Sequence, residues 1–210
     1  MKRFLLLTFV ALASMSVWAV QKKTYTFAQR DTCELKMDVY QPNDTLKEHP
    51  CVFFIFGGGF KSGERNTPSA VTYMQQLAQA GIVGVAIDYR LGLKGVENVG
   101  LVKLAKLMEN TIDIGVEDAY DAVLYTLKHA EELRINPKQI ILSGSSAGAI
   151  LSLQCDYYLQ NEHPLSNRLP ADFRFSGVVS FAGAIAAFDG KVRYKHQPAP
   201  TFFLHGTKDK

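Results

Sequence analysis

The apolar positions of this chain follow two spacings, one typical of strands and one typical of helices. Residues 24–29 and 35–40 alternate apolar and polar side chains across a short polar stretch, which predicts an antiparallel hairpin at the edge of a sheet. Apolar runs predict buried strands at residues 51–56, 82–87 and 140–142, and further strands are predicted at 175–181 and 201–204. Helical spacing predicts helices at residues 68–80, 120–130 and 147–159, the second of them stopped by Asn136-Pro137. Strands that alternate with helices after an antiparallel edge predict a three-layer α/β/α sandwich with a mostly parallel sheet.

One connection in this pattern is unusually long. Residues 91–113 separate a strand from a helix, whereas such connections have roughly two to six residues in most α/β units. Within this segment, residues 101–108 are predicted to form a short helix. A surface insertion and a cover over the mouth of a substrate site both fit the segment, and the sequence favours neither.

The first residues differ from the rest and predict export. A basic start at Lys2-Arg3, an apolar stretch and a small-residue exit make residues 1–19 typical of a secretory signal peptide. The expected location is therefore the periplasm or the medium, with no membrane partner after cleavage. The chain as a whole is 47% hydrophobic and 20% charged, an ordinary globular composition, and residues 20–210 form one predicted domain.

Charge and cysteine content exclude several kinds of partner and cofactor. Without Lys2 and Arg3, 21 basic side chains remain against 20 acidic ones, so there is no electrostatic reason to expect a nucleic acid partner. Cys33, Cys51 and Cys155 are an odd set without metal-ligand spacing, which predicts no metal site and at least one unpaired thiol. No cofactor is expected.

The stretch Gly144-Ser-Ser-Ala-Gly148 fits the Gly-x-Ser-x-Gly pattern of a nucleophile elbow, with a predicted strand before it and a predicted helix after it. Such a turn is so tight that a side chain at 144 or 148 would collide with its neighbours. Ser146 is therefore predicted to project from the sheet as a nucleophile. The alternative is a small-residue turn that only packs closely.

A second glycine-rich segment, Phe56-Gly-Gly-Gly-Phe60, directly follows a predicted buried strand. Three glycines let the backbone approach a ligand closely, as a loop that donates N–H groups to an oxyanion must do. A phosphate loop is not indicated, because the pattern Gly-x-x-x-x-Gly-Lys-Ser/Thr is absent. A plain flexible turn is the alternative.

These segments together resemble the α/β-hydrolase superfamily, in its esterase and hormone-sensitive-lipase-like branch. The resemblance rests on the glycine loop, on Asp88-Tyr-Arg-Leu91, on the elbow and on His205-Gly-Thr-Lys-Asp209, all in the family's order. More finely, the chain looks like exported bacterial esterases that act on esterified plant polysaccharides or their fragments.

The resemblance implies roles for individual residues. Ser146 would be the nucleophile, and the backbone N–H groups of Gly58, Gly59 and Ala147 would form the oxyanion hole. Asp209 falls where the family keeps the acid of its catalytic triad. In the family, the residues at 88–90 brace loops rather than react.

The chain departs from the family's pattern at two places. Phe56 stands where the glycine loop usually opens with histidine, which would remove a hydrogen bond that holds the loop. The catalytic histidine is expected tens of residues after Asp209, beyond Lys210. None of the histidines present fills that role convincingly: they are His49, His129, His163, His196 and His205. The hydrolase domain is therefore expected to lack its last strand and histidine loop at its C-terminal end, and residues 20–210 alone are expected to be inactive.

The predicted activity is hydrolysis of carboxylic esters through an acyl-enzyme on Ser146. Short acyl groups are expected, with acetyl or feruloyl esters of plant polysaccharides as candidate substrates, so the expected partner is a small-molecule or oligosaccharide ester. Two alternatives stay open: an exported peptidase of the prolyl-oligopeptidase type, and a non-catalytic binding protein on the same fold.

Overall fold

The computed structural model of the chain describes residues 20–187 and 190–208. Among these residues, the strands are β1 (Gln21–Gln29), β2 (Glu34–Gln41), β3 (His49–Ile55), β4 (Val83–Ile87), β5 (Ile135–Ser145), β6 (Gly177–Phe181) and β7 (Thr201–Leu204). The helices are α1 (Pro68–Gln79), α2 (Leu101–Lys128), α3 (Ala130–Leu133), α4 (Ala147–Gln160) and the 3-10 helix η1 (Pro164–Arg168). The predicted signal peptide, residues 1–19, lies outside the described residues.

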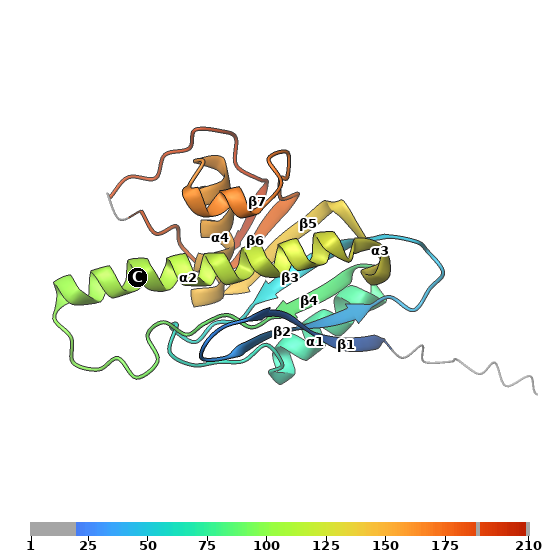
Figure 1. Cartoon of the computed structure of the whole chain (residues 1–210), viewed down its shortest axis with the longest axis horizontal. Coiled ribbons are helices and arrows are strands. Elements are labelled where there is room, and N and C mark those ends of the chain that lie inside the picture. The colour runs from blue at the N-terminus through green and yellow to red at the C-terminus, as the bar shows by residue number, and fades with distance from the viewer. Residues whose placement is uncertain (1–19, 188–189, 209–210) are drawn as a thin grey trace, which may run out of the picture.

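One sheet in the order β1-β2-β4-β3-β5-β6-β7 joins all the described strands. The predicted hairpin is confirmed, because β1 pairs antiparallel with β2, which in turn pairs antiparallel with β4. From β4 to β7 the pairing is parallel, so the carboxyl ends of β3 to β7 meet at one edge of the sheet. In Figure 1 the loop after β3 and the start of α2 lie toward this edge.

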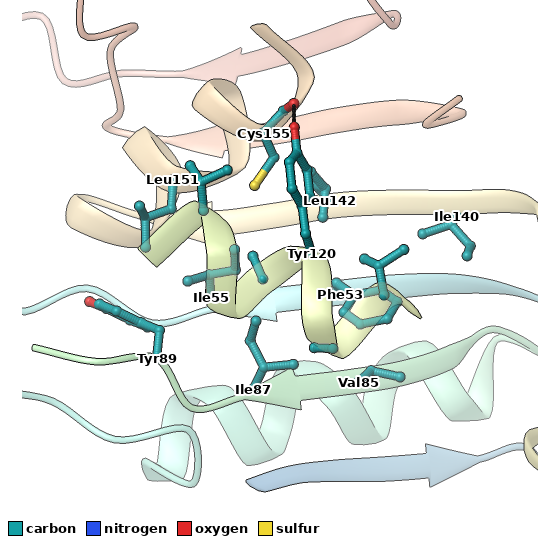
Figure 2. Packing of buried hydrophobic residues seen from close by; sticks show 14 of the residues in the cluster. Phe53, Ile55, Val85, Ile87, Tyr89, Tyr120, Ile140, Leu142, Leu151 and Cys155 are labelled. Atoms are coloured by element: carbon teal, nitrogen blue, oxygen red, sulfur yellow. Dashed lines mark hydrogen bonds between the residues drawn. The ribbon is translucent and has the colours of Figure 1, made fainter. Parts of the chain in front are cut away.

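Helices cover both faces of the sheet, which confirms the predicted three layers. Alternate residues of a strand point to opposite faces. In β4, Val85 and Ile87 belong to the same core cluster as Tyr120 of α2, whereas Ala86 packs with Met74 of α1. Figure 2 shows the first cluster, in which the Tyr120 hydroxyl donates to the Cys155 carbonyl of α4 at 2.6 Å. Cys155 is fully buried there, as its helical position predicted.

The prediction for residues 91–113 was wrong about where the helix starts. Instead of a short helix and a later one, α2 runs without a break for 28 residues from Leu101 to Lys128. Gly115 lies within it, and a Cβ added there would lie 2.7 Å from a methyl of Leu151. This glycine lets α2 and α4 pack closely, and the helical hydrogen bonds continue past it. The loop before α2 therefore ends at Gly100, and the first turns of α2 extend beyond the sheet (Figure 1).

The Asn136-Pro137 pair was expected to stop a helix but lies inside β5. Helix α2 already ends at Lys128, and after α3 the chain reverses at Arg134, which has a φ of 57°. The register between β3 and β5 then shifts near Pro137, since His49 pairs with Ile135 but Cys51 pairs with Ile140. Extra residues in a strand form such a bulge, where proline's missing N–H is tolerated.

Strand β7 forms one edge of the described sheet. Its residues Phe202, Phe203 and Leu204 are each more than half exposed, at 59%, 55% and 57%. Among the described residues, no helix is long and apolar enough to cross a membrane.

Candidate active site

Ser146 lies at the turn between β5, which ends at Ser145, and α4, which begins at Ala147. Its backbone angles are φ 51° and ψ −118°. Residues with a side chain rarely adopt this conformation, which costs on the order of 1–3 kcal/mol. The turn is held in part by a hydrogen bond of 2.8 Å from the Ser146 N–H to the Phe181 carbonyl. Ser146 is exposed, whereas Gly144, Ala147 and Gly148 of the same turn are buried, so the predicted nucleophile does project from the sheet.

The elbow requires glycine at both predicted positions. A Cβ at Gly144 would lie 2.2 Å from the carbonyl oxygen of Gly148. A Cβ at Gly148 would lie 2.0 Å from the carbonyl oxygen of Ile55 in β3. Both distances are far below van der Waals contact with backbone atoms that cannot move aside, so the predicted clash is confirmed.

Residues 56–60, the oxyanion loop, pass directly beside the elbow. Strands β3 and β5 are parallel neighbours with Ile55 opposite Gly144, so the segments that follow them start side by side. A Cβ at Gly57 would lie 2.7 Å from the carbonyl oxygen of Ser145 and 3.2 Å from the Cβ of Ser146. The structure therefore brings the two predicted glycine motifs together at the nucleophile.

The three predicted oxyanion donors are free to bind a ligand. Gly58 has a φ of 128° and Gly59 a φ of 61°, so the loop turns in a way that favours glycine. Among the described residues, neither of their N–H groups donates a hydrogen bond. Ala147 is the first residue of α4, where an N–H has no partner within the helix, and the positive end of the helix dipole lies there. These groups can stabilise a negative oxygen next to Ser146.

Tyr89, just after β4, holds the oxyanion loop from behind. Its hydroxyl donates to the carbonyl oxygen of Phe56 at 3.0 Å, and its ring centroid lies 4.5 Å from that of Phe56. The ring also meets Phe60 edge-on at 6.4 Å. Tyr89 is buried, which raises the pKa of its phenol, so the hydroxyl stays a donor at neutral pH. Tyr89 thus braces the oxyanion loop, as the resemblance implied for residues 88–90, through a hydrogen bond to the backbone of Phe56.

The neighbours of Tyr89 are engaged in ion pairs, as the resemblance implied for loop-bracing residues. Asp88 pairs with Arg65 at 2.6 Å and accepts a hydrogen bond from the backbone of β2. Arg90 donates through Nε to both oxygens of Asp118 in α2, at 3.0 and 2.9 Å. Asp118 is fully buried and also accepts from Arg30 of the β1–β2 turn. This network fixes the loop after β4 to α2 and to the hairpin.

Two histidines with suitable chemistry lie at the wrong end of α4. His163 follows the end of α4 and stacks on Tyr158 at 3.8 Å, and burial lowers its pKa. His196 contacts Glu162 at 3.1 Å at the same end. Ser146 precedes the first residue of this 14-residue helix, which at about 1.5 Å per residue separates the two ends by roughly 21 Å. Neither histidine can act as a base for Ser146 in this arrangement.

The other three histidines lie away from the end of α4, in or next to strands β3 and β7 and after helix α2. His49 is the buried first residue of β3, where it contacts the Gly81 carbonyl at 3.0 Å, far from the carboxyl edge. His129 follows α2 and stacks on Tyr125. His205 follows β7, which is parallel to β6, so it lies at the same sheet edge as Ser146 but two strands away, about 10 Å across the sheet.

Asp209, the predicted acid, lies outside the described residues, as does any histidine beyond Lys210. Among the described residues, no group of three or more potential ligands could hold a metal ion. Cys33, Cys51 and Cys155 are all unpaired. Burial raises the pKa of the Cys51 and Cys155 thiols, so neither offers a thiolate nucleophile at neutral pH.

Comparison with known sequences adds a family and several relatives. A family model named BD-FAE matches residues 37–198. An AB hydrolase superfamily protein of Schizosaccharomyces pombe is 33% identical over 113 residues, which make up 52% of this chain and 28% of that protein. An acetyl esterase of Salmonella choleraesuis is 24% identical over 179 residues, 82% of this chain and 50% of that enzyme. The chain thus spans half or less of the length of these relatives.

Solved structures with the same architecture include esterase 2 of Thermogutta terrifontis. Its apo form superposes with a TM-score of 0.65 at 22% identity, over 89% of this chain and 72% of that one. A structure of this esterase with propionate bound gives a TM-score of 0.60 at 25% identity, over 77% of this chain and 54% of the other. These likenesses confirm the predicted α/β-hydrolase fold.

Proposed function

Because this chain belongs to the BD-FAE family, in the esterase branch of the α/β-hydrolases, we propose that it is the nucleophile-bearing part of a serine esterase. One observation carries the proposal. Ser146 is exposed at a strained turn, and the oxyanion loop passes so close that a Cβ on Gly57 would touch the Ser146 side chain. A binding protein has no need of a strained serine beside unsatisfied N–H groups.

In the proposed reaction, a histidine takes the proton from the Ser146 hydroxyl as its oxygen attacks the ester carbonyl carbon. The N–H groups of Gly58, Gly59 and Ala147 stabilise the oxyanion of the tetrahedral intermediate. The carbon–oxygen bond to the alcohol then breaks, and the alcohol leaves with the proton from the histidine. Water hydrolyses the acyl-enzyme by the same steps and releases the acid.

The histidine and the acid of the triad belong outside the described residues. Asp209 is proposed as the acid, five residues after the end of β7. The histidine is proposed to follow Lys210, since His163 and His196 lie at the far end of α4 from the nucleophile. A catalytic base must come within about 3 Å of the serine hydroxyl.

The proposed substrates are short acyl esters, with acetyl or feruloyl esters of plant polysaccharides as the candidates. The name of the Salmonella relative, an acetyl esterase, supports a short acyl group. The structure is compatible with this, because the described residues between β6 and β7 form no helix that could shelter a long acyl chain. Export through residues 1–19 is part of the proposal, since polysaccharide esters lie outside the cell.

The test is Ser146→Ala in the protein extended by the codons that follow Lys210. The variant should lose hydrolysis of p-nitrophenyl acetate by on the order of 10⁶-fold, as loss of a triad nucleophile does, while its circular dichroism and melting temperature stay unchanged. Ser145→Ala, the adjacent serine, is the matched control and should keep most of the activity. Activity of Ser146→Ala within tenfold of wild type would overturn the assignment.

A second experiment locates the base. Residues 20–210 alone and the extended protein are treated with a fluorophosphonate probe, and labelling of Ser146 is measured by mass spectrometry. The shorter chain should label far more slowly, because the hydroxyl has no base. Equal labelling would show that a histidine already present, with His205 the best placed, serves Ser146.

A further inference from the structure

The segment at residues 61–66 connects the oxyanion loop to α1, and Arg65 attaches this segment to the sheet. The other residues of the segment are all exposed, whereas the Arg65 side chain is only 17% exposed. Its Nη1 donates to the carboxylate of Asp88, just after β4, at 2.6 Å. Its Nε lies 3.3 Å from the carboxylate of Asp38 in β2. One guanidinium group thus joins the connecting segment to two strands of the sheet.

The same segment packs directly against a glycine of the oxyanion loop. The N–H groups of Lys61 and Ser62 donate to the Gly58 carbonyl at 3.1 and 3.2 Å. A Cβ added to Gly58 would lie 2.0 Å from the Ser62 carbonyl oxygen. Because these backbones touch, a shift of the segment would also move Gly58, whose N–H is a proposed oxyanion donor. Arg65 follows Ser62 by three residues, which is at most about 11 Å of chain.

Both carboxylates that hold Arg65 also have other partners. Asp38 is fully buried, accepts a hydrogen bond from Thr24 at 2.6 Å and pairs with Lys22 at 2.9 Å. Asp88 accepts a hydrogen bond from the backbone of β2 at 3.1 Å. Loss of the Arg65 guanidinium would therefore leave neither carboxylate without a partner. The sheet should keep its structure, while the segment after the oxyanion loop loses its attachment.

We propose that Arg65 is a positioning residue of the oxyanion hole, because its two ion pairs fix the end of the loop that carries the Gly58 N–H. The inference rests on the proposed function, and in this role Arg65 acts through the backbone of Gly58 and not on the reacting ester. Arginine suits the role better than lysine, since its planar guanidinium presents separate donors to two carboxylates. If Arg65 only stabilised the fold, its loss would lower the free energy of unfolding without changing the turnover of the folded enzyme.

The kinetic test uses Arg65→Met and Arg65→Lys in the extended protein, with Arg134→Met as the matched control. Arg134 also anchors a loop, because it donates to the carbonyls of Pro42 and Leu46 at 3.0 and 2.9 Å. That loop precedes β3, so it lies at the edge of the sheet opposite the one that carries Ser146. Both methionine variants should lose stability in urea unfolding, which shows that each arginine anchors its loop.

Only the Arg65 variants should lose turnover. Arg65→Met should lower kcat for p-nitrophenyl acetate by roughly 10- to 100-fold with a smaller change in KM, which is less than the roughly 10²–10³-fold effect of deleting an oxyanion donor. Arg65→Lys keeps the charge but not the two-carboxylate geometry, so its kcat should fall between that of Arg65→Met and that of wild type. An unchanged kcat in both Arg65 variants, or an equal fall in Arg134→Met, would overturn the proposal.

Amide hydrogen exchange separates this inference from the proposed function. The N–H groups of Lys61 and Ser62 report on the turn, because both donate to the Gly58 carbonyl. Their exchange should be roughly 10-fold faster in Arg65→Met than in wild type and unchanged in Arg134→Met. If wild type hydrolyses no ester but this exchange increases, only the proposed function fails and Arg65 still holds the turn. Unchanged exchange at both amides in Arg65→Met would overturn the role of Arg65 and leave the esterase assignment intact.

Discussion

Removing the Tyr89 hydroxyl should slow catalysis without affecting the reacting atoms. Tyr89→Phe keeps the ring that stacks on Phe56 and deletes only the 3.0 Å hydrogen bond to the Phe56 carbonyl. Tyr89 is 4% exposed and Phe56 5%, so water cannot readily replace the hydroxyl. A buried carbonyl left without its partner costs about 1–3 kcal/mol. If the loop shifts to relieve that cost, the Gly58 and Gly59 N–H groups lose their alignment in the transition state.

The expected result is a fall in kcat of roughly 5- to 150-fold, the factor that 1–3 kcal/mol represents, with a smaller change in KM. The assay is steady-state hydrolysis of p-nitrophenyl acetate by the extended protein, together with its rate of inactivation by a fluorophosphonate. Both report formation of a tetrahedral centre that needs the oxyanion hole.

Tyr120→Phe is the matched control. Its hydroxyl also donates from a buried ring to a backbone carbonyl, that of Cys155 at 2.6 Å, but in the core between α2 and α4. Both variants should lose similar stability in urea unfolding, whereas only Tyr89→Phe should lose kcat. Equal kcat values for the two variants would refute the idea that Tyr89 positions the oxyanion loop.

Three further predictions concern stability and substrate choice. Asp118→Ala leaves Arg30 and Arg90 without their buried partner and should lower the free energy of unfolding by about 3–5 kcal/mol in urea titration. Removing the exposed carboxylate of Glu162 should have a far smaller effect, because its ion pair with Lys195 is exposed to solvent. Burial raises the pKa of Asp156, so the folded state is favoured while this carboxyl is protonated. That contribution to stability is lost as the pH rises through the folded-state pKa of Asp156. Asp156→Asn should therefore gain stability relative to wild type as the pH rises above about 4, the ordinary value of the carboxyl pKa, and a difference that does not change with pH would contradict the shift. Kinetics with p-nitrophenyl esters should give a higher kcat/KM for acetate than for dodecanoate, since the described structure has no helical cap after β6.

The elbow was predictable because its constraints are local. Gly144 and Gly148 flank Ser146 at fixed spacing, and the clash that excludes other residues follows from the sharpness of one turn. The oxyanion loop was predictable for the same reason, from glycines that follow a buried strand. Short-range sterics can be inferred from sequence.

Features that depend on tertiary contacts could not be predicted in the same way. The hydrogen bond from Tyr89 to Phe56 requires that β3 and β4 be parallel neighbours with Ile55 opposite Ile87, a register that the sequence does not state. The continuous α2 was missed: the two predicted helices leave residues 109–119 unassigned, and Gly115, a weak helix former, lies among them, whereas in the structure the helix runs through it and packs against Leu151 of α4. The remoteness of His163 from Ser146, in contrast, could be predicted, because the helix expected at residues 147–159 lies between them.

The unbroken α2 also makes its exposed first turn mechanically continuous with the core. From Gly115, where α2 meets α4, to Leu101 at its first turn is a rigid span of about 21 Å at 1.5 Å per residue. A tilt of about 5° at that contact would move the outer end by about 2 Å, more than the tolerance of a well-formed binding site. Substitutions at the α2–α4 contact therefore have a route to moving the first turn of α2 and the segment before it, although they lie deep in the core.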